Sequence, residues 1–367
     1  MINPNNLCMG CMNELAEGES ICSKCGFSPE DYNRKRSGRT LAPMTILAGK
    51  YLLGKVLGEG GFGITYLAWD LNKEEKIAVK EYFPGALAYR NTRSSVEEYI
   101  TPLNSTADTY YQKGLKSFVE EARNLKKFDA IPGIVSVKDF FYENKTAYIV
   151  MEYIEGMTLK QVMEKLESPM VWSQVLEVMH PVLKALEKIH REGIIHRDIS
   201  PDNIIVGGDG KVTLIDFGAA RFQTGNETKS LSVILKQGYA PVEQYQSRGK
   251  QGPWTDVYAV CATMYYMMSG IVPAESIERI SEELLVPLSE LQPDIPREIS
   301  DAVSHGMKVL WQERSQDMQV LEAELYEKRK SGAEDPYPKL EWIDVVICIY
   351  LVIVIVVAIS VVLFLLS

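Results

Sequence analysis

The sequence predicts an α+β protein in which one large central domain lies between two unrelated appendages. Strand-like runs flank a Gly-rich turn in the middle of the chain, and helical patterns follow them. Two Cys-x-x-Cys pairs stand near the N-terminus, and an uncharged apolar run occupies the C-terminal end. At 367 residues the chain exceeds the usual size of one domain, about 100 to 200 residues, and 46% of its residues are hydrophobic. We therefore expect a folded body with attachments.

The net charge of the chain is −10, which disfavours a nucleic-acid-binding body because phosphate neutralisation needs a surplus of Lys and Arg. No nucleic-acid partner is expected. Residues 31–50 are interpreted as a linker. Their short basic run is interpreted as solvated, with contact to anionic lipid or a partner as the alternative; it consists of Arg34, Lys35, Arg36 and Arg39.

Residues 1–30 are predicted to form a zinc ribbon, because two Cys-x-x-Cys pairs can place four thiolates around one tetrahedral ion. The four predicted ligands of Zn²⁺ are Cys8, Cys11, Cys22 and Cys25. Gly10 and Gly26 fit the tight turns of such a module. A segment this short folds mainly through metal ligation, so the zinc would be structural. The alternative is a pair of disulfides, which a reducing cytoplasm disfavours.

Residues 342–366 are predicted to form one transmembrane helix. Val345 to Leu366 carries no charged side chain and would span roughly 33 Å as a helix. A buried globular helix is the alternative, but the run has no polar face. Residues 327–341 would be a juxtamembrane tether. Its basic residues place the bulk of the chain on the cytoplasmic side by the positive-inside rule; they are Lys328, Arg329, Lys330 and Lys339.

A Gly-rich turn lies between two strand-like runs that begin at Tyr51. Gly58, Gly60 and Gly63 fit the spacing G-x-G-x-x-G, which dinucleotide-binding folds also use. A strand rather than a helix is expected after these glycines, which argues against the dinucleotide alternative. Further on, the strand Ile77 to Lys80 ends in one lysine, and a helical stretch places Phe118, Ala122 and Leu125 on one face.

The most specific stretch is His196-Arg197-Asp198, followed by Asn203 and then by Asp216-Phe217-Gly218. This order and spacing match H-R-D-x-x-x-x-N and D-F-G, and so many fixed positions do not agree by chance. A carboxylate beside an attacking hydroxyl and oxygen ligands for Mg²⁺ are what phosphoryl transfer needs.

On these motifs, residues 51–326 resemble bacterial protein kinases of the eukaryotic serine/threonine type, which implies the two-lobed protein-kinase fold. The resemblance implies that Asp198 is the catalytic base and that Asn203 and Asp216 hold Mg²⁺ or Mn²⁺. Lys80 would meet the ATP phosphates, with Glu121, chosen over Glu120, holding it in place. The other implied ATP-binding residues are Gly58, Glu59, Gly60, Gly63, Thr65, Ala78 and the hinge residues Glu152, Tyr153 and Ile154.

The resemblance also implies an activation segment from Ala219 to Gly238 and a pair between Glu243 and Arg314. Arg197 would receive a phosphate from this segment, whose candidate sites are Thr224, Thr228, Ser230 and Ser232. One position departs from the family pattern. Ser200 stands where serine/threonine kinases usually have a lysine, which removes a positive charge and weakens the prediction of Ser/Thr over Tyr as acceptor.

The predicted function is transfer of the γ-phosphate of ATP to protein hydroxyls, with autophosphorylation, at the cytoplasmic face of a membrane. Protein substrates, the lipid bilayer and a second copy for trans-autophosphorylation are the expected partners. The alternative is a membrane-tethered pseudokinase scaffold that recruits partners through the zinc ribbon, and a third interpretation makes the ribbon a nucleic-acid contact. Retention of Lys80, Asp198, Asn203 and Asp216 favours the enzyme.

Overall fold

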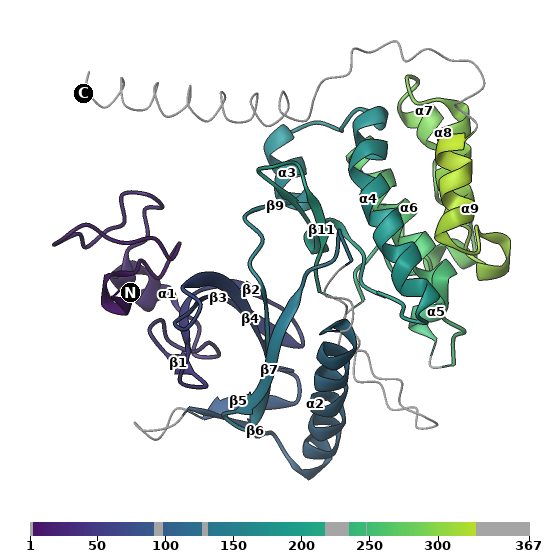
Figure 1. The fold of residues 1–367 in the computed structure, drawn as a ribbon. Helices are drawn as coiled ribbons and strands as arrows, with labels where there is room; N and C mark the ends of the chain where they lie inside the picture. Colours follow the sequence, from purple (N-terminus) through teal and green to yellow (C-terminus); the bar gives the residue numbers. More distant parts are fainter. Residues whose placement is uncertain (1–2, 92–97, 127–130, 217–234, 247, 328–367) are drawn as a thin grey trace, which may run out of the picture. The chain divides into compact units, whose positions relative to one another are not determined.

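The computed structural model describes residues 3–91, 98–126, 131–216, 235–246 and 248–327. They divide into two compact units (Figure 1). The first unit holds residues up to 126 together with 135–153, and the second holds 131–134 and the described residues from 154 onward. The chain leaves the first unit between Tyr153 and Ile154, inside the predicted hinge.

The first unit is built on a six-stranded antiparallel sheet in the order β1-β2-β3-β4-β8-β7. Its strands are β1 (Ile46–Leu47), β2 (Tyr51–Glu59), β3 (Gly63–Asp70), β4 (Glu75–Tyr82), β7 (Val137–Glu143) and β8 (Thr146–Glu152). A short hairpin, β5 (Ala88–Asn91) with β6 (Tyr99–Pro102), forms a second sheet. Strands β3, β4 and β8 are buried along most of their length, which makes them the core of this unit.

Helix α2 (Ser105–Leu125) lies along strands β7 and β8 (Figure 1). The Asn104 side chain caps its N-terminus by accepting a hydrogen bond from the Ala107 amide at 2.8 Å. Phe118, Ala122 and Leu125 are all buried, so the predicted apolar face is confirmed. The same helix carries Glu121.

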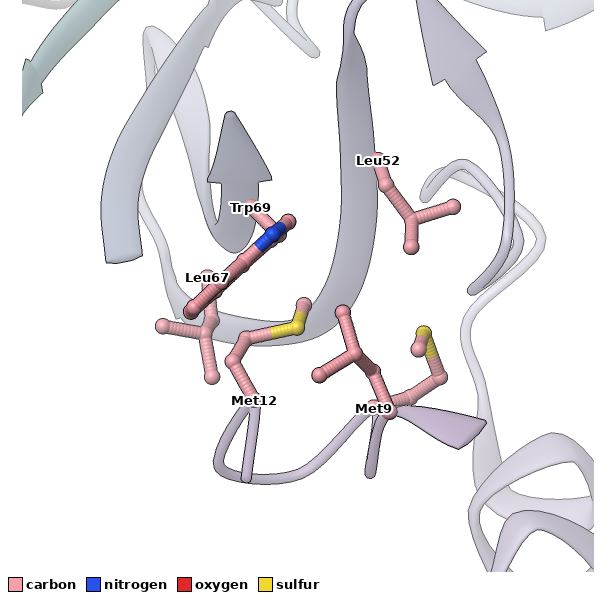
Figure 2. Packing of buried hydrophobic residues seen from close by; sticks show 6 residues of the cluster. Met9, Met12, Leu52, Leu67 and Trp69 are labelled. Atoms are coloured by element: carbon pink, nitrogen blue, oxygen red, sulfur yellow. The ribbon is translucent and has the colours of Figure 1, made fainter. Parts of the chain in front are cut away.

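The cysteine-rich module packs against strands β2 and β3 of the first unit. Met9 and Met12 are buried against Leu52, Leu67 and Trp69 from β2 and β3 (Figure 2). The Met9 carbonyl also accepts a hydrogen bond from the Lys55 amide at 2.7 Å. A Cβ at Gly54 would come within 2.4 Å of both methionines, so only glycine allows this approach. The module is therefore a packed part of the unit.

Residues 31–50 differ from the expected linker. Helix α1 (Pro29–Lys35), which follows the short 3-10 helix η1 (Pro4–Asn6), brings the Tyr32 hydroxyl to the Val56 amide at 2.8 Å. The Leu41 amide donates to the Tyr66 hydroxyl at 3.0 Å. Most of the basic run is exposed, which agrees with its interpretation as solvated, while Tyr32 before it and Leu41 after it hydrogen-bond to the sheet.

A buried acid, Glu81, joins four parts of the first unit. Its carboxylate accepts hydrogen bonds from the hydroxyls of Tyr66 and Tyr148 at 2.9 and 2.8 Å, and pairs with the Arg90 guanidinium at 2.5 Å. Arg90 in turn donates to the Arg39 carbonyl at 2.7 Å. Burial and the charge of Glu81 raise the pKa of Tyr148 well above its usual value, so its hydroxyl stays a donor.

The second unit is mainly helical. Its helices are α3 (Leu159–Leu166), α4 (Trp172–Arg191), α5 (Val242–Tyr245), α6 (Pro253–Ser269), α7 (Leu288–Leu291), α8 (Arg297–Gly306) and α9 (Met318–Glu322), with the short helices η3 (Pro201–Asn203), η4 (Glu278–Ile280), η5 (Trp311–Glu313) and η6 (Ala323–Glu327). Three strands form a small sheet in the order β11 (Val212–Leu214), β10 (Ile204–Gly207) and β9 (Gly156–Thr158).

Helix α6 is the centre of the second unit, since almost every side chain along it is buried. It contacts α4, α8, α7 and α9. A helix apolar on all faces must be surrounded by other elements. The helix ends at Gly270, whose φ of +73° closes the last turn.

Across the described ranges, no helix combines the length and the apolar character needed to cross a membrane. The predicted transmembrane helix at 342–366 lies outside the described residues, as does the predicted tether except for its first residue, Glu327.

Replacing Arg90 with alanine should destabilise the first unit by about 3 to 5 kcal/mol, because the Glu81 carboxylate would stay buried without its cationic partner. Urea unfolding of the variant measures this loss. Arg34→Ala is the matched control, since Arg34 pairs with Asp31 on the surface and contributes only about 0 to 1 kcal/mol. Equal losses in the two variants would contradict the role given to Arg90.

Candidate active site

A buried aspartate holds the H-R-D segment, defined as His196 to Asn203, in place. The Asp256 carboxylate accepts hydrogen bonds from the backbone amides of His196 and Arg197, each at 2.8 Å, and contacts His190 Nε2 at 2.7 Å. Burial acts to raise the pKa of Asp256, but these donors outweigh it and hold the pKa below its usual value. Asp256 is therefore a fixed negative charge under the segment.

Within the segment, Asn203 orients Asp198. The Asn203 Nδ2 group donates to the Asp198 carbonyl at 2.7 Å and to its carboxylate at 3.0 Å. An amide has one oxygen and one NH₂ group, so these bonds leave the Asn203 oxygen for another partner. The Asn203 carbonyl accepts from the Ile215 amide at 2.8 Å, which places the neighbouring Asp216 on the same side of the second unit. The backbone thus brings Asp216 near Asn203, and the roles of Asp198, Asn203 and Asp216 in catalysis and Mg²⁺ binding stay predictions.

A lysine contacts the segment at the position where a positive charge is missing from the sequence. The Lys236 ammonium donates to the Ser200 hydroxyl at 2.6 Å and to the Asp202 carboxylate at 3.1 Å. Lys160 lies 3.4 Å from Asp202. Burial acts to raise the pKa of Asp202, yet the charges of Lys236 and Lys160 bring it below its usual value. Lys236 therefore supplies, from a more distant part of the chain, the positive charge that is missing at position 200.

The predicted pair between Glu243 and Arg314 is confirmed. Two guanidinium nitrogens bind the two carboxylate oxygens at 2.8 and 3.0 Å, and both side chains are buried. Arg314 also donates to the Val309 carbonyl at 2.7 Å, and Thr255 donates to Glu243 at 3.1 Å. A buried bidentate pair with these extra bonds fixes the segment after Lys236 to the helical body.

In the first unit, the predicted Gly-rich turn is a hairpin between β2 and β3. Gly58 stands opposite Thr65, and the Gly60 amide donates to the Gly63 carbonyl at 2.8 Å. A strand follows the glycines, so the dinucleotide alternative is wrong here. A Cβ at Gly63 would lie 2.6 Å from the Glu81 carbonyl and 3.5 Å from the Lys80 side chain. Glycine is needed because the hairpin lies directly against the Glu81 carbonyl, next to Lys80.

Several of the remaining predicted ATP-binding residues lie on the same sheet. Lys80 lies in β4 opposite Thr65, and Ala78 lies opposite Met151 in β8. Glu59 ends β2 and Glu152 ends β8, directly before Tyr153 and Ile154. Glu121 is on α2, and its pairing with Lys80 stays a prediction.

The four cysteines of the N-terminal module converge. Their sulfur atoms all lie within 4.8 Å of one another, with Cys8 to Cys25 at 3.6 Å and Cys11 to Cys22 at 3.8 Å. Thiolates bound at about 2.3 Å around a tetrahedral zinc would be about 3.8 Å apart. The separations far exceed a disulfide bond of about 2.05 Å, and the four thiols are free. The donor set therefore fits zinc.

The glycines beside these cysteines have the predicted roles. Gly26 has a φ of +67°, which favours glycine. A Cβ at Gly10 would lie 2.4 Å from the Phe27 side chain, so that turn requires close approach of the chain.

Three residues of the active site were not predicted as such: Asp256, His190 and Lys236. Asp256 is 60 residues from His196 along the chain, and no local motif links it to the H-R-D segment. The predicted activation segment lies outside the described residues from Ala219 to Ile234, so its candidate phosphorylation sites remain predictions.

Comparison with known proteins identifies the family. The model of the protein kinase domain matches residues 51–324. The structure titled PpkA-294 apo form is 34% identical and has a TM-score of 0.68, over 78% of this chain and 99% of that one. The Mycobacterium tuberculosis PknI kinase domain is 20% identical with a TM-score of 0.58, over 79% of this chain and all of that one, and shares the fold.

Among curated relatives, serine/threonine-protein kinase F of Synechocystis sp. is 32% identical over 239 residues, and PknA of Nostoc sp. is 34% identical over 239 residues. These matches cover 61% and 63% of this chain and 45% and 39% of the relatives. The chain thus spans less than half the length of these relatives. With the H-R-D segment, the D-F-G aspartate and the matched domain in agreement, this chain belongs to the protein kinase family and is similar to its bacterial serine/threonine members.

Proposed function

We propose that this protein transfers the γ-phosphoryl group of ATP to serine or threonine hydroxyls of proteins. The observation that supports this most is the placement of the Asp198 carboxylate. It accepts a hydrogen bond from the Asn203 amide, and the backbone of the segment is held by two hydrogen bonds to Asp256. Phosphoryl transfer depends on positioned charge more than on covalent chemistry by the protein. The proposed substrates are proteins, among them a second copy of this chain.

In the reaction, the acceptor hydroxyl oxygen forms a bond to the γ-phosphorus while the bond from that phosphorus to the β–γ bridging oxygen breaks. The hydroxyl proton passes to the Asp198 carboxylate, and ADP carries away the electron pair of the broken bond. The Asn203 oxygen and the Asp216 carboxylate would hold Mg²⁺, which when bound neutralises charge on the phosphates. Lys80 would bind the α- and β-phosphates, under the glycine hairpin.

Asp198→Asn should lower kcat for phosphoryl transfer about a hundredfold to ten-thousandfold, because the amide cannot accept the hydroxyl proton. Incubation with γ-labelled ATP, Mg²⁺ and a general acceptor such as casein measures the transfer. Asp209→Asn is the matched control, since Asp209 lies on an exposed turn beside Lys211. Undiminished transfer by Asp198→Asn would sink the assignment of the base.

We further propose that the four cysteines bind one structural zinc ion. The tetrahedral spacing of the sulfurs supports this, and so does the packing of Met9 and Met12 onto the sheet. A module this small has little core of its own, so ligation would contribute most of its folding free energy. The ion would thereby hold Met9 and Met12 of the module against β2 and β3.

Purified protein should contain one zinc per chain, and Cys22→Ser/Cys25→Ser should lose it, as measured by plasma mass spectrometry. The melting temperature should fall together with the zinc, because the module packs on the first unit. Ser23→Ala, between the two ligands, should keep the metal. A metal-free wild-type protein with disulfides between these cysteines would refute the proposal.

We also propose that residues 342–366 anchor the protein in a cell membrane with the kinase domain in the cytoplasm. The uncharged run from Val345 and the basic residues before it support this placement.

Deleting the chain from Val345 onward should move the kinase from the membrane fraction to the soluble fraction. Replacing the same run with an unrelated apolar helix should keep it in the membrane fraction. Unchanged membrane association of the truncated chain would count against an anchor in this segment.

A further inference from the structure

Lys236 reaches the H-R-D segment from a position 36 residues further along the chain. Its ammonium donates to the hydroxyl of Ser200, which is fully buried, at 2.6 Å. Ser200 stands two residues after Asp198, and its carbonyl accepts a hydrogen bond from the Asn203 amide at 3.0 Å. The lysine is therefore attached to the same rigid turn that presents the catalytic base.

The backbone of Lys236 is also fixed. Its carbonyl accepts hydrogen bonds from the amides of Tyr239 and Ala240, both at 3.1 Å. The Ala240 carbonyl accepts from the Ser276 hydroxyl at 2.8 Å, and both Ser276 and Ala240 are buried. A long flexible side chain that is held at both ends has already lost much of its conformational entropy.

The ion pair with Asp202 at 3.1 Å accounts for part of this arrangement, but the shorter contact of 2.6 Å is to the neutral Ser200 hydroxyl, which does not by itself require an ammonium partner. From Asp198 to Asn203 the segment carries two acids and no base, although the charge that develops on a transferring phosphoryl group needs positive partners. An ammonium has three hydrogens. Among the described residues, Ser200 and Asp202 take two of them, so one is left for a ligand.

We propose that Lys236 supplies the positive charge for the transferred phosphoryl group beside Asp198, in place of a lysine at position 200. This inference rests on the proposed kinase activity. As the acceptor oxygen bonds to the γ-phosphorus and the bridging oxygen departs with ADP, the third Lys236 hydrogen binds a γ-phosphate oxygen. The lysine remains protonated throughout, and the hydroxyl proton goes to Asp198. Ser200 acts as a positioning residue for the ammonium.

Control of the site depends on where its two charged groups lie in the chain. Lys236 lies near the C-terminal end of the predicted activation segment, whereas Asp198 and Asn203 belong to the H-R-D segment. The cation and the base are thus on separate stretches of chain, and the site is complete only when the two stretches meet through Ser200.

An exchange of the two side chains tests this inference in the full-length protein. Lys236→Ser should lower kcat about a hundredfold to a thousandfold, with the KM for ATP nearly unchanged. The double variant Ser200→Lys/Lys236→Ser returns the charge from the other side of the contact and should recover at least tenfold of the loss. Lys160→Met is the matched control, because it removes a lysine from Asp202 but not from Ser200, and should keep its kcat.

Normal kcat in Lys236→Ser, or no recovery in the double variant, would overturn the proposal. Wild-type protein that transfers no phosphate would instead contradict the proposed function itself, so the two failures are distinguishable.

A measurement on the wild-type chain avoids any dependence on variant folding. Acylation of lysines, read by mass spectrometry, is compared in Mg²⁺ with ADP and with the non-hydrolysable analogue AMP-PNP, which adds a γ-phosphoryl group. Lys236 should be protected by AMP-PNP severalfold more than by ADP, while Lys160 should react equally with both. Equal labelling of Lys236 in the two complexes would overturn the proposal.

Discussion

The buried carboxylate of Asp256 is the constraint on which the rest of the active site depends. Arg197 has a φ of +68°, a left-handed conformation that costs a non-glycine residue about 1 to 2 kcal/mol. The two backbone bonds to Asp256 hold the chain in that conformation and direct the next residue, Asp198, out of the turn. Because Asp256 lies in the first turn of the central helix α6, the position of Asp198 is fixed relative to a helix that is buried along almost its whole length.

Charge in this protein is arranged through contacts between distant parts of the chain. Arg314 neutralises Glu243, Arg90 neutralises Glu81, and Lys236 lies against Ser200 and Asp202. The first two pairs are buried and satisfied by further hydrogen bonds, so they fix structure. Lys236 is 31% exposed, which is the accessibility that a ligand-binding cation needs. The substitution at position 200 is in this view a relocation of charge, not a loss.

The motifs with fixed local spacing could be predicted from the sequence because each is formed within a few residues. The H-R-D segment, the glycine hairpin and the Cys-x-x-Cys pairs have this property. The contacts of Asp256 and Lys236 span 60 and 36 residues, and no periodicity or spacing connects their partners. The contact of Met9 and Met12 with Trp69, and the hydrogen bonds of Tyr32 and Leu41 to the sheet, are likewise formed between distant residues and cannot be predicted from local spacing.

The most direct measurement is a crystal structure of the protein with Mg²⁺ and AMP-PNP. We expect a metal with the Asn203 oxygen and the Asp216 carboxylate at about 2.0 to 2.1 Å, and a γ-phosphate oxygen within hydrogen-bond distance of the Lys236 ammonium. Nucleotide bound away from Asp198, or bound there with Lys236 turned from the γ-phosphate, would contradict this expectation.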